Sequence, residues 1–112
     1  MDPRKTDEDQ WLAQVRSIYL STANDKLSQL AVALNGLAQA PGSRAAFRRM
    51  DRLLHNLVGS GGSYGVPEVS EVARLMLRTL KSEREGGEIS HAALADLRAG
   101  IGELRGVFAG AE

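Results

Sequence analysis

The 112-residue sequence contains no cysteine, which excludes disulfides, thiolate catalysis and cysteine-ligated metal sites. Its 14 basic and 14 acidic residues cancel to a formal net charge of zero. This balance argues against nucleic acid as a partner, because proteins that bind it usually carry a basic excess or a basic stripe. No apolar run approaches the ~20 residues of a membrane span, and no stretch alternates apolar and polar residues as a strand does. We therefore expect neither a membrane protein nor a β-sheet.

The N-terminal segment 1–6 is polar, contains Pro3, and is predicted to be a flexible N-terminus. Three acidic residues, Asp7, Glu8 and Asp9, follow it. This start is too polar and acidic for a signal peptide, so we expect a cytoplasmic protein. Charged residues make up 25% and hydrophobic residues 43% of the chain, which is typical of a globular protein. The length then predicts one domain, over residues 7–110.

A long first helix is predicted from residue 7 to residue 40, because apolar residues recur there every three or four positions. Pro41 and Gly42 end it, and a bend is expected near Asn24 and Asp25. One face of this helix carries the stripe Leu12, Val15, Tyr19, Ala23, Leu27, Leu30, Leu34 and Leu37.

Three shorter helices follow. Ser43 caps the second, which reaches a turn at residues 62–65, and Gly61 on its inward face would let a neighbouring helix approach closely. Pro67 opens the third, residues 81–88 form a solvated loop, and Ser90 caps the fourth. The inward residues are Phe47, Met50, Leu54, Leu57 and Gly61 in the second helix, Val69, Val72, Ala73, Met76, Leu77 and Leu80 in the third, and Leu94, Leu97, Ile101, Leu104 and Phe108 in the fourth.

Four amphipathic helices with short connections predict an all-α protein, an antiparallel up-down four-helix bundle. We expect it to be a monomer. The side chains predicted to be buried are Leu12, Val15, Leu30, Leu34, Phe47, Leu54, Leu57, Val72, Met76, Leu97, Ile101 and Leu104.

His55, one of two histidines, is the candidate functional residue. At about 100° per residue it lies roughly 120° from the centre of the apolar stripe of its helix, so it projects from the flank of the bundle. Two of its neighbours are glycines, which destabilise the middle of a helix. They would leave the imidazole uncovered, so that another protein can approach it. The neighbours on this flank are Arg48, Asp51, Arg52, Val58, Gly59 and Gly62.

Other roles for His55 are open at this point. A single histidine on a helix is often a surface residue without a role. Metal binding is disfavoured, because no histidine, cysteine or carboxylate follows it at the third or fourth position. A hydrolase is disfavoured, since the stretch has no nucleophile elbow. Asp51, one turn earlier, could accept a hydrogen bond from the ring or be a solvated charge.

The stretch around His55 resembles the signature of the histidine-containing phosphotransfer (HPt) domain, a four-helix bundle, and is similar to the phosphoacceptor (P1) domain of chemotaxis kinases. The family pattern is a histidine, a leucine two residues later, a run of small residues, an aromatic-glycine turn, and a helix that opens with a proline-glutamate pair. The matching residues are His55, Asn56, Leu57, Val58, Gly59, Ser60, Gly61, Gly62, Ser63, Tyr64, Gly65, Val66, Pro67 and Glu68.

The resemblance implies a phosphocarrier intermediate of a two-component phosphorelay rather than an independent enzyme. His55 would take a phosphoryl group from a histidine kinase or an aspartyl phosphate and pass it to the aspartate of a response-regulator receiver domain. The chain itself would need no cofactor, since Mg²⁺ is expected on the receiver.

The chain departs from the family pattern at two positions. Val58 stands where the family usually has a lysine or arginine, and Leu77 stands where it often has a carboxylate that orients the imidazole. Arg48 and Arg52 could supply the missing positive charge. The departures leave open an alternative function, a pseudo-HPt binding module that docks on a receiver or kinase without exchanging phosphate. A structural or dimerising bundle, with His55 incidental, is a third.

Overall fold

The computed structural model describes the backbone of residues 3–112 and the side chains from residue 7 onward. The described chain is helical, with no strand in residues 3–112, so the predicted all-α class is confirmed. The helices are α1 (Pro3–Ser21), α2 (Ala23–Gln39), α3 (Arg44–Ser63), α4 (Pro67–Lys81) and α5 (His91–Ala111).

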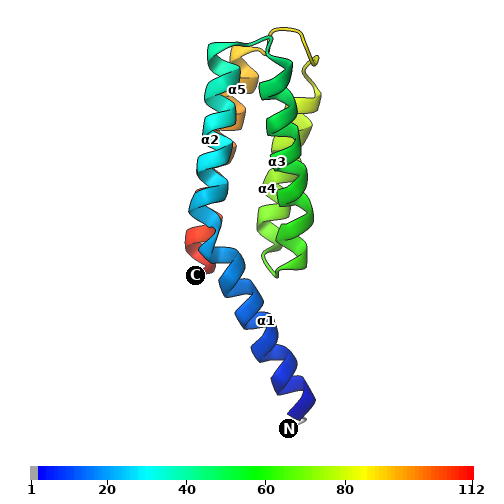
Figure 1. The fold of residues 1–112 in the computed structure, drawn as a ribbon, viewed down its shortest axis with the longest axis vertical. Coiled ribbons are helices and arrows are strands. Elements are labelled where there is room, and N and C mark those ends of the chain that lie inside the picture. Colours follow the sequence, from blue (N-terminus) through cyan, green and yellow to red (C-terminus); the bar gives the residue numbers. More distant parts are fainter. Residues whose placement is uncertain (1–2) are drawn as a thin grey trace.

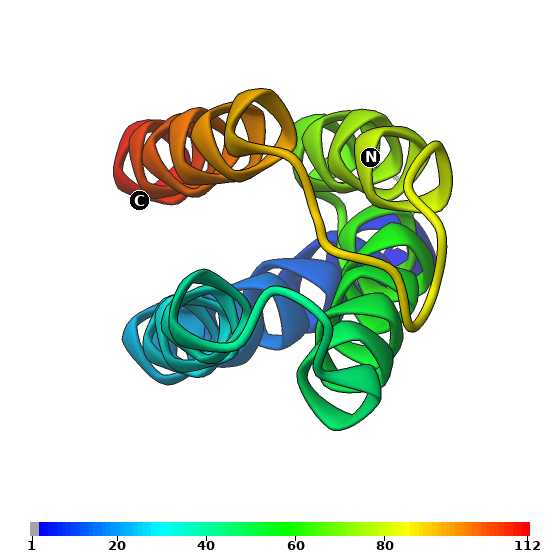
Figure 2. The same ribbon diagram turned by 90° about the horizontal axis from the view of Figure 1, so that it is seen from above.

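Helices α2 to α5 form the four-helix bundle. Each runs antiparallel to the next along the chain, and α5 also packs against α2, which closes the bundle (Figure 1). Seen from above, the four helices surround a common centre (Figure 2). The most extensive contact is between α3, which contains His55, and α4, in whose first turn the His55 motif ends.

The core agrees with the sequence pattern at most of the predicted positions. Val15 and Val72 are half-buried rather than buried, and Leu12 is 53% exposed, so its predicted burial is wrong. The predicted core residues found buried are Leu30, Leu34, Phe47, Leu54, Leu57, Met76, Leu97, Ile101 and Leu104.

The predicted helix starts are confirmed for α3, α4 and α5. Ser43 Oγ accepts a hydrogen bond from the Ala46 N–H at 3.2 Å, and Ser90 Oγ accepts one from the Ala93 N–H at 3.0 Å. Pro67 is the first residue of α4. Two boundaries were predicted wrongly. Helix α3 continues through Gly62 to Ser63, and α4 includes Lys81, which was expected in the following loop.

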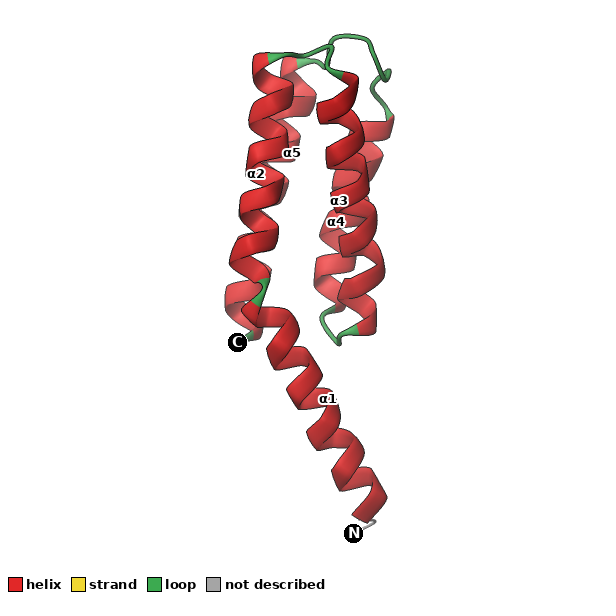
Figure 3. Cartoon of the chain, in the orientation of Figure 1, coloured by secondary structure: helices red, strands yellow, loops and turns green. Residues whose placement is uncertain are grey.

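The predicted long first helix is two helices, separated at Thr22 (Figure 3). The Thr22 hydroxyl donates to the Tyr19 carbonyl at 2.7 Å, a local bond that competes with the helical pattern. The break therefore precedes the bend expected near Asn24. Helix α1 begins at Pro3 rather than near Asp7; residues 1–2 lie outside the described residues, and the flexibility expected of segment 1–6 stays a prediction.

Helix α1 points away from the bundle (Figure 1), which explains the exposure of Leu12. Trp11 and Ile18 are also exposed, at 62% and 67%. The buried residue of α1 is Tyr19, which joins α1 to the bundle by stacking on Tyr64 with 4.9 Å between ring centroids.

Candidate functional site

His55 lies in the middle of α3, and its side chain is 58% exposed. The helical wheel predicted this exposed position on the flank. Leu54 and Leu57, its neighbours in the sequence, are buried in the core. They fix the rotation of α3 about its axis, so the imidazole is held outward.

The close approach of α3 and α4 depends on Gly61. A Cβ at this position would lie 2.6 Å from Ser70 Oγ and 2.7 Å from the Ser70 backbone nitrogen. A real Cβ atom essentially never makes contacts this short, so only glycine fits without displacing α4. The close packing predicted for Gly61 is confirmed.

The buried Ser70 side chain joins α4 to the backbone of α3. Its hydroxyl donates to the Val58 carbonyl at 2.7 Å and accepts from the Gly62 N–H at 2.8 Å. An α-helix would pair this carbonyl with this amide, since they are four residues apart. The hydroxyl therefore bridges two backbone groups one turn beyond His55, and it fixes the register of α4 against α3. That antiparallel register places Leu77 at the level of His55.

Asp51 lies between His55 and the end of α4. Its Oδ1 atom is 3.5 Å from His55 Nε2 and 3.1 Å from Lys81 Nζ. This oxygen is shielded from solvent, and within the described residues neither neighbour meets it with hydrogen-bond geometry. The Asp51 side chain is 25% exposed, so one oxygen of the carboxylate is shielded while the group as a whole still reaches solvent. Asp51 is a carboxylate shared between an imidazole and an ammonium group.

The two arginines proposed as substitutes for a cation at position 58 differ. Arg48 Nε is 2.7 Å from Glu85 Oε1, so its charge is directed to the loop after α4. Arg52 is exposed. Val58 is half-buried and packs against the core.

Gly59 and Gly62 are both exposed. A Cβ at Gly59 would meet nothing within 4 Å, and one at Gly62 would make only an ordinary contact with Ser70 Oγ at 3.7 Å. Internal packing therefore requires neither glycine. This is consistent with their predicted role of leaving the imidazole uncovered, a role that stays a prediction.

A comparison with protein families matches residues 14–107 to the Hpt domain. The chain belongs to the Hpt domain family. Hpt domains are histidine phosphotransfer modules of phosphorelays, and they generally interact with kinases and receiver domains. The matched residues include the whole of α2, α3 and α4 and most of α5. Comparison with curated proteins and with solved structures gave no match.

Two residues of this Hpt domain were missed by sequence reasoning. Lys81 was assigned to a loop, and Ser70 did not stand out because it is a polar residue on the inward side of α4. The sequence did contain an indication that Lys81 lies near Asp51. Once Gly61 is taken as the crossing point of two antiparallel helices, the register places the end of α4 at the level of Asp51.

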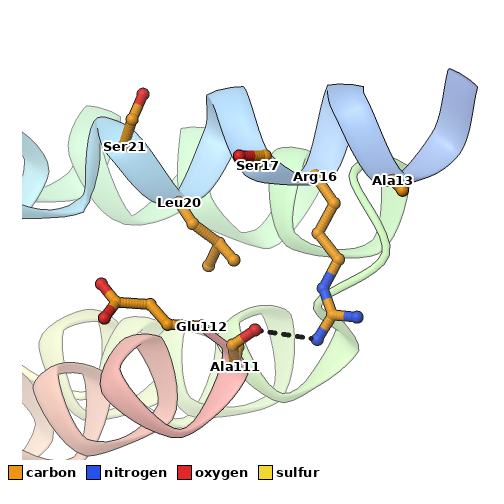
Figure 4. Close-up of a pocket in the computed structure, with 7 residues that line it drawn as sticks. All are labelled: Ala13, Arg16, Ser17, Leu20, Ser21, Ala111 and Glu112. Atoms are coloured by element: carbon orange, nitrogen blue, oxygen red, sulfur yellow. Dashed lines mark hydrogen bonds between the residues drawn. The ribbon is translucent and has the colours of Figure 1, made fainter. Parts of the chain in front are cut away.

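A hollow on the surface of this Hpt domain lies away from His55. It is an open groove of about 480 Å³ between α1 and the end of α5, where Arg16 Nη2 donates to the Ala111 carbonyl at 3.2 Å (Figure 4). No residue of α3 or α4 lines it. Among the residues described, no group of three histidines, cysteines or carboxylates could hold a metal, and no helix is long and apolar enough to cross a membrane.

Proposed function

We propose that this chain carries a phosphoryl group on His55 and exchanges it with the active-site aspartate of a response-regulator receiver domain. The observation that carries the proposal is the exposed imidazole on α3, with Gly59 and Gly62 exposed beyond it on the same helix. Membership of the Hpt family supports the same role.

The transfer needs little from this chain beyond position. A lone pair on a ring nitrogen of His55 attacks the phosphorus of the aspartyl phosphate in line, and a P–N bond forms while the P–O bond to the receiver aspartate breaks. The aspartate carboxylate leaves with the electron pair, and the positive charge stays on the ring until its other nitrogen releases a proton. Correct positioning of the imidazole against the phosphoryl group supplies most of the acceleration of the transfer. We propose that Mg²⁺ is held by the receiver, and that this chain contributes no cofactor.

The docking surface would be the flank of α3 around His55. Val58 supplies an apolar centre and the exposed Arg52 a charged rim. A carrier must release one partner before it reaches the next, so we expect a small and transient interface and a monomeric free protein. Histidine kinases and receivers are the expected partners, and the cytoplasmic location expected from the sequence stays a prediction.

A second function is favoured by one specific observation. Val58 and Leu77 are apolar where the family usually or often has polar residues, and the register places Leu77 at the level of His55. A module that docks on a receiver without accepting phosphate would tolerate both residues. This alternative predicts binding without labelling.

The two functions are separated by incubating the chain with ³²P-labelled receivers of the source organism. The carrier predicts label on this chain that is lost in acid and kept in base, as for a phosphoramidate and opposite to a serine ester. Binding of a receiver with no such label would replace the carrier with the docking module.

A further inference from the structure

The structure places a cation beside His55 that does not come from the helix of the histidine. Lys81 is the last residue of α4, and its Nζ is 3.1 Å from Asp51 Oδ1. The same oxygen is 3.5 Å from His55 Nε2. The ammonium and the imidazole therefore lie next to one carboxylate oxygen, with that oxygen as the shared neighbour.

A phosphoryl group on His55 would bring about two negative charges next to the Asp51 carboxylate. The phosphoryl group and the Asp51 carboxylate repel each other, and a cation between them would offset this repulsion. Apart from His55 itself, Lys81 is the one basic side chain that pairs with Asp51 in the part of the chain that the structure describes. Its flexible four-carbon stem and three N–H donors let it turn from the carboxylate to a phosphoryl oxygen without moving the backbone.

We propose that Lys81, held by Asp51 in the unphosphorylated protein, binds the phosphoryl group on His55 and replaces the cation that Val58 cannot provide. This inference rests on the proposed function. Lys81 is a phosphoryl-binding residue in it, while Asp51 is a positioning residue that keeps the ammonium beside the ring.

The other basic residues of the flank fit the role less well. Arg48 is paired with Glu85 at 2.7 Å and is directed away along α3. Arg52 is exposed, and no ion pair holds it beside the ring in the described residues. Lys81 also lies at the C-terminus of α4, where the helix dipole favours a positive charge.

The test uses the full chain phosphorylated with potassium phosphoramidate, which transfers its phosphoryl group to histidine with loss of ammonia and needs no receiver. All variants carry His91→Gln, so that the signal comes from His55. The pKa of the phosphoryl group is followed by ³¹P NMR titration. Lys81→Gln should raise this pKa by about 0.2–0.7 unit, the range expected for one exposed ion pair, and shorten the lifetime of phospho-His55.

The matched variants separate a direct role of Lys81 from an indirect one. Lys81→Arg should keep the wild-type phosphoryl pKa, and Arg52→Gln should change it less than Lys81→Gln does. In an Asp51→Asn background, Lys81→Gln should still raise the pKa, because the ammonium acts on the phosphoryl group itself. If the effect of Lys81→Gln vanishes in that background, Lys81 acts only through Asp51 and the inference is wrong.

Two further outcomes would overturn the proposal that Lys81 binds the phosphoryl group. An unchanged phosphoryl pKa in Lys81→Gln would show that the ammonium does not reach the group, even if exchange with a receiver is normal. A chain that phosphoramidate does not label at His55 would also contradict it. Failure of exchange with receivers, with a normal Lys81 effect, would instead count against the proposed function alone.

Discussion

The α3–α4 pair and helix α1 are held in place by different means. In the α3–α4 pair, Gly61 brings two backbones into close approach and Ser70 bonds directly to backbone groups of the other helix. Helix α1 is attached mainly through side chains near its C-terminal end, Tyr19 above all, and exposes Trp11 and Ile18.

This difference shows which region can hold functional side chains at fixed relative positions. Backbone-level contacts fix the register of α3 and α4, so the positions of His55, Asp51 and Lys81 relative to one another follow from the fold. Helix α1 makes few contacts with the bundle, and the orientation of α1 therefore depends on a few side chains, among them Tyr19, Leu20 and Arg16. We expect changes in the α3–α4 pair to affect both stability and phosphotransfer, and changes in α1 to affect neither strongly.

The largest expected difference is between two leucines that the sequence pattern treated alike. Leu57→Ala should lower the free energy of unfolding by ~2–5 kcal/mol, because Leu57 is 3% exposed in the bundle core. Leu12→Ala on α1 should stay within about 0.5 kcal/mol, the range of surface changes. Urea denaturation measures both. Equal losses for the two variants would show that α1 packs into the core.

The glycines of α3 give the next comparison. Gly61→Ala should destabilise the chain by about 1–3 kcal/mol, because the methyl group would overlap Ser70 of α4. Gly59→Ala, where a Cβ meets nothing, should instead stabilise α3 by up to about 1 kcal/mol. If Gly59 serves to uncover the imidazole, the same variant should slow transfer from a receiver. Denaturation and a transfer assay distinguish the two effects.

Tyr19→Phe tests the attachment of α1. The phenol oxygen is 2.9 Å from Ser60 Oγ, and losing this bond should cost about 0.5–1.5 kcal/mol. Tyr64→Phe is the control, because the stack with Tyr19 is kept. A loss of equal size in Tyr64→Phe would show that the effect is not specific to the hydrogen bond between Tyr19 and Ser60.

Tyr19→Phe should also change how the stability of the protein depends on pH. Burial raises the pKa of Tyr19 above its unfolded value of 10.0, so the unfolded chain loses the proton first and stability falls as pH rises through the folded pKa. Burial lowers the pKa of Lys26, which therefore destabilises the folded chain at neutral pH and stops doing so above 10.5. Tyr19→Phe should remove the alkaline fall and leave the opposite trend from Lys26. Denaturation midpoints between pH 8 and 11 measure it.

Val58→Lys has the smallest expected effect on stability, because the stem of a lysine can cover the same apolar surface while its charge reaches water. With a second cation near the ring, the lifetime of phospho-His55 should lengthen. Slower transfer through weaker docking would mark Val58 as an apolar contact for the receiver. An unchanged lifetime would mean that Lys81 already saturates the role.

The bundle could be predicted because each of its helices carries an apolar stripe, and because Ser43, Pro67 and Ser90 mark the starts of α3, α4 and α5. The position of α1 could not be predicted, since Leu12 and Leu27 continue the same spacing, and periodicity does not tell whether a partner helix faces the stripe. At the break, the hydroxyl and the backbone N–H of Thr22 both donate to the Tyr19 carbonyl, local bonds that compete with the regular helix and that periodicity does not reveal.

The exposure of His55 could be predicted from the helical wheel, because that argument concerns one helix only. The contact of Asp51 with Lys81 could not, since it depends on the register between two helices. Ser70 sets that register by reaching the α3 backbone, and a serine in the sequence carries no sign of such a bond.

The measurement that tests the central claim most directly is the site of phosphorylation after incubation with a cognate phospho-receiver. His55→Gln should keep the fold, because the side chain is largely exposed, and should abolish the acid-labile label. His91→Gln should be labelled like the wild type, since His91 is exposed at the start of α5 outside the motif. Label that persists in His55→Gln, or a wild type that binds its receiver and stays unlabelled, would contradict the account.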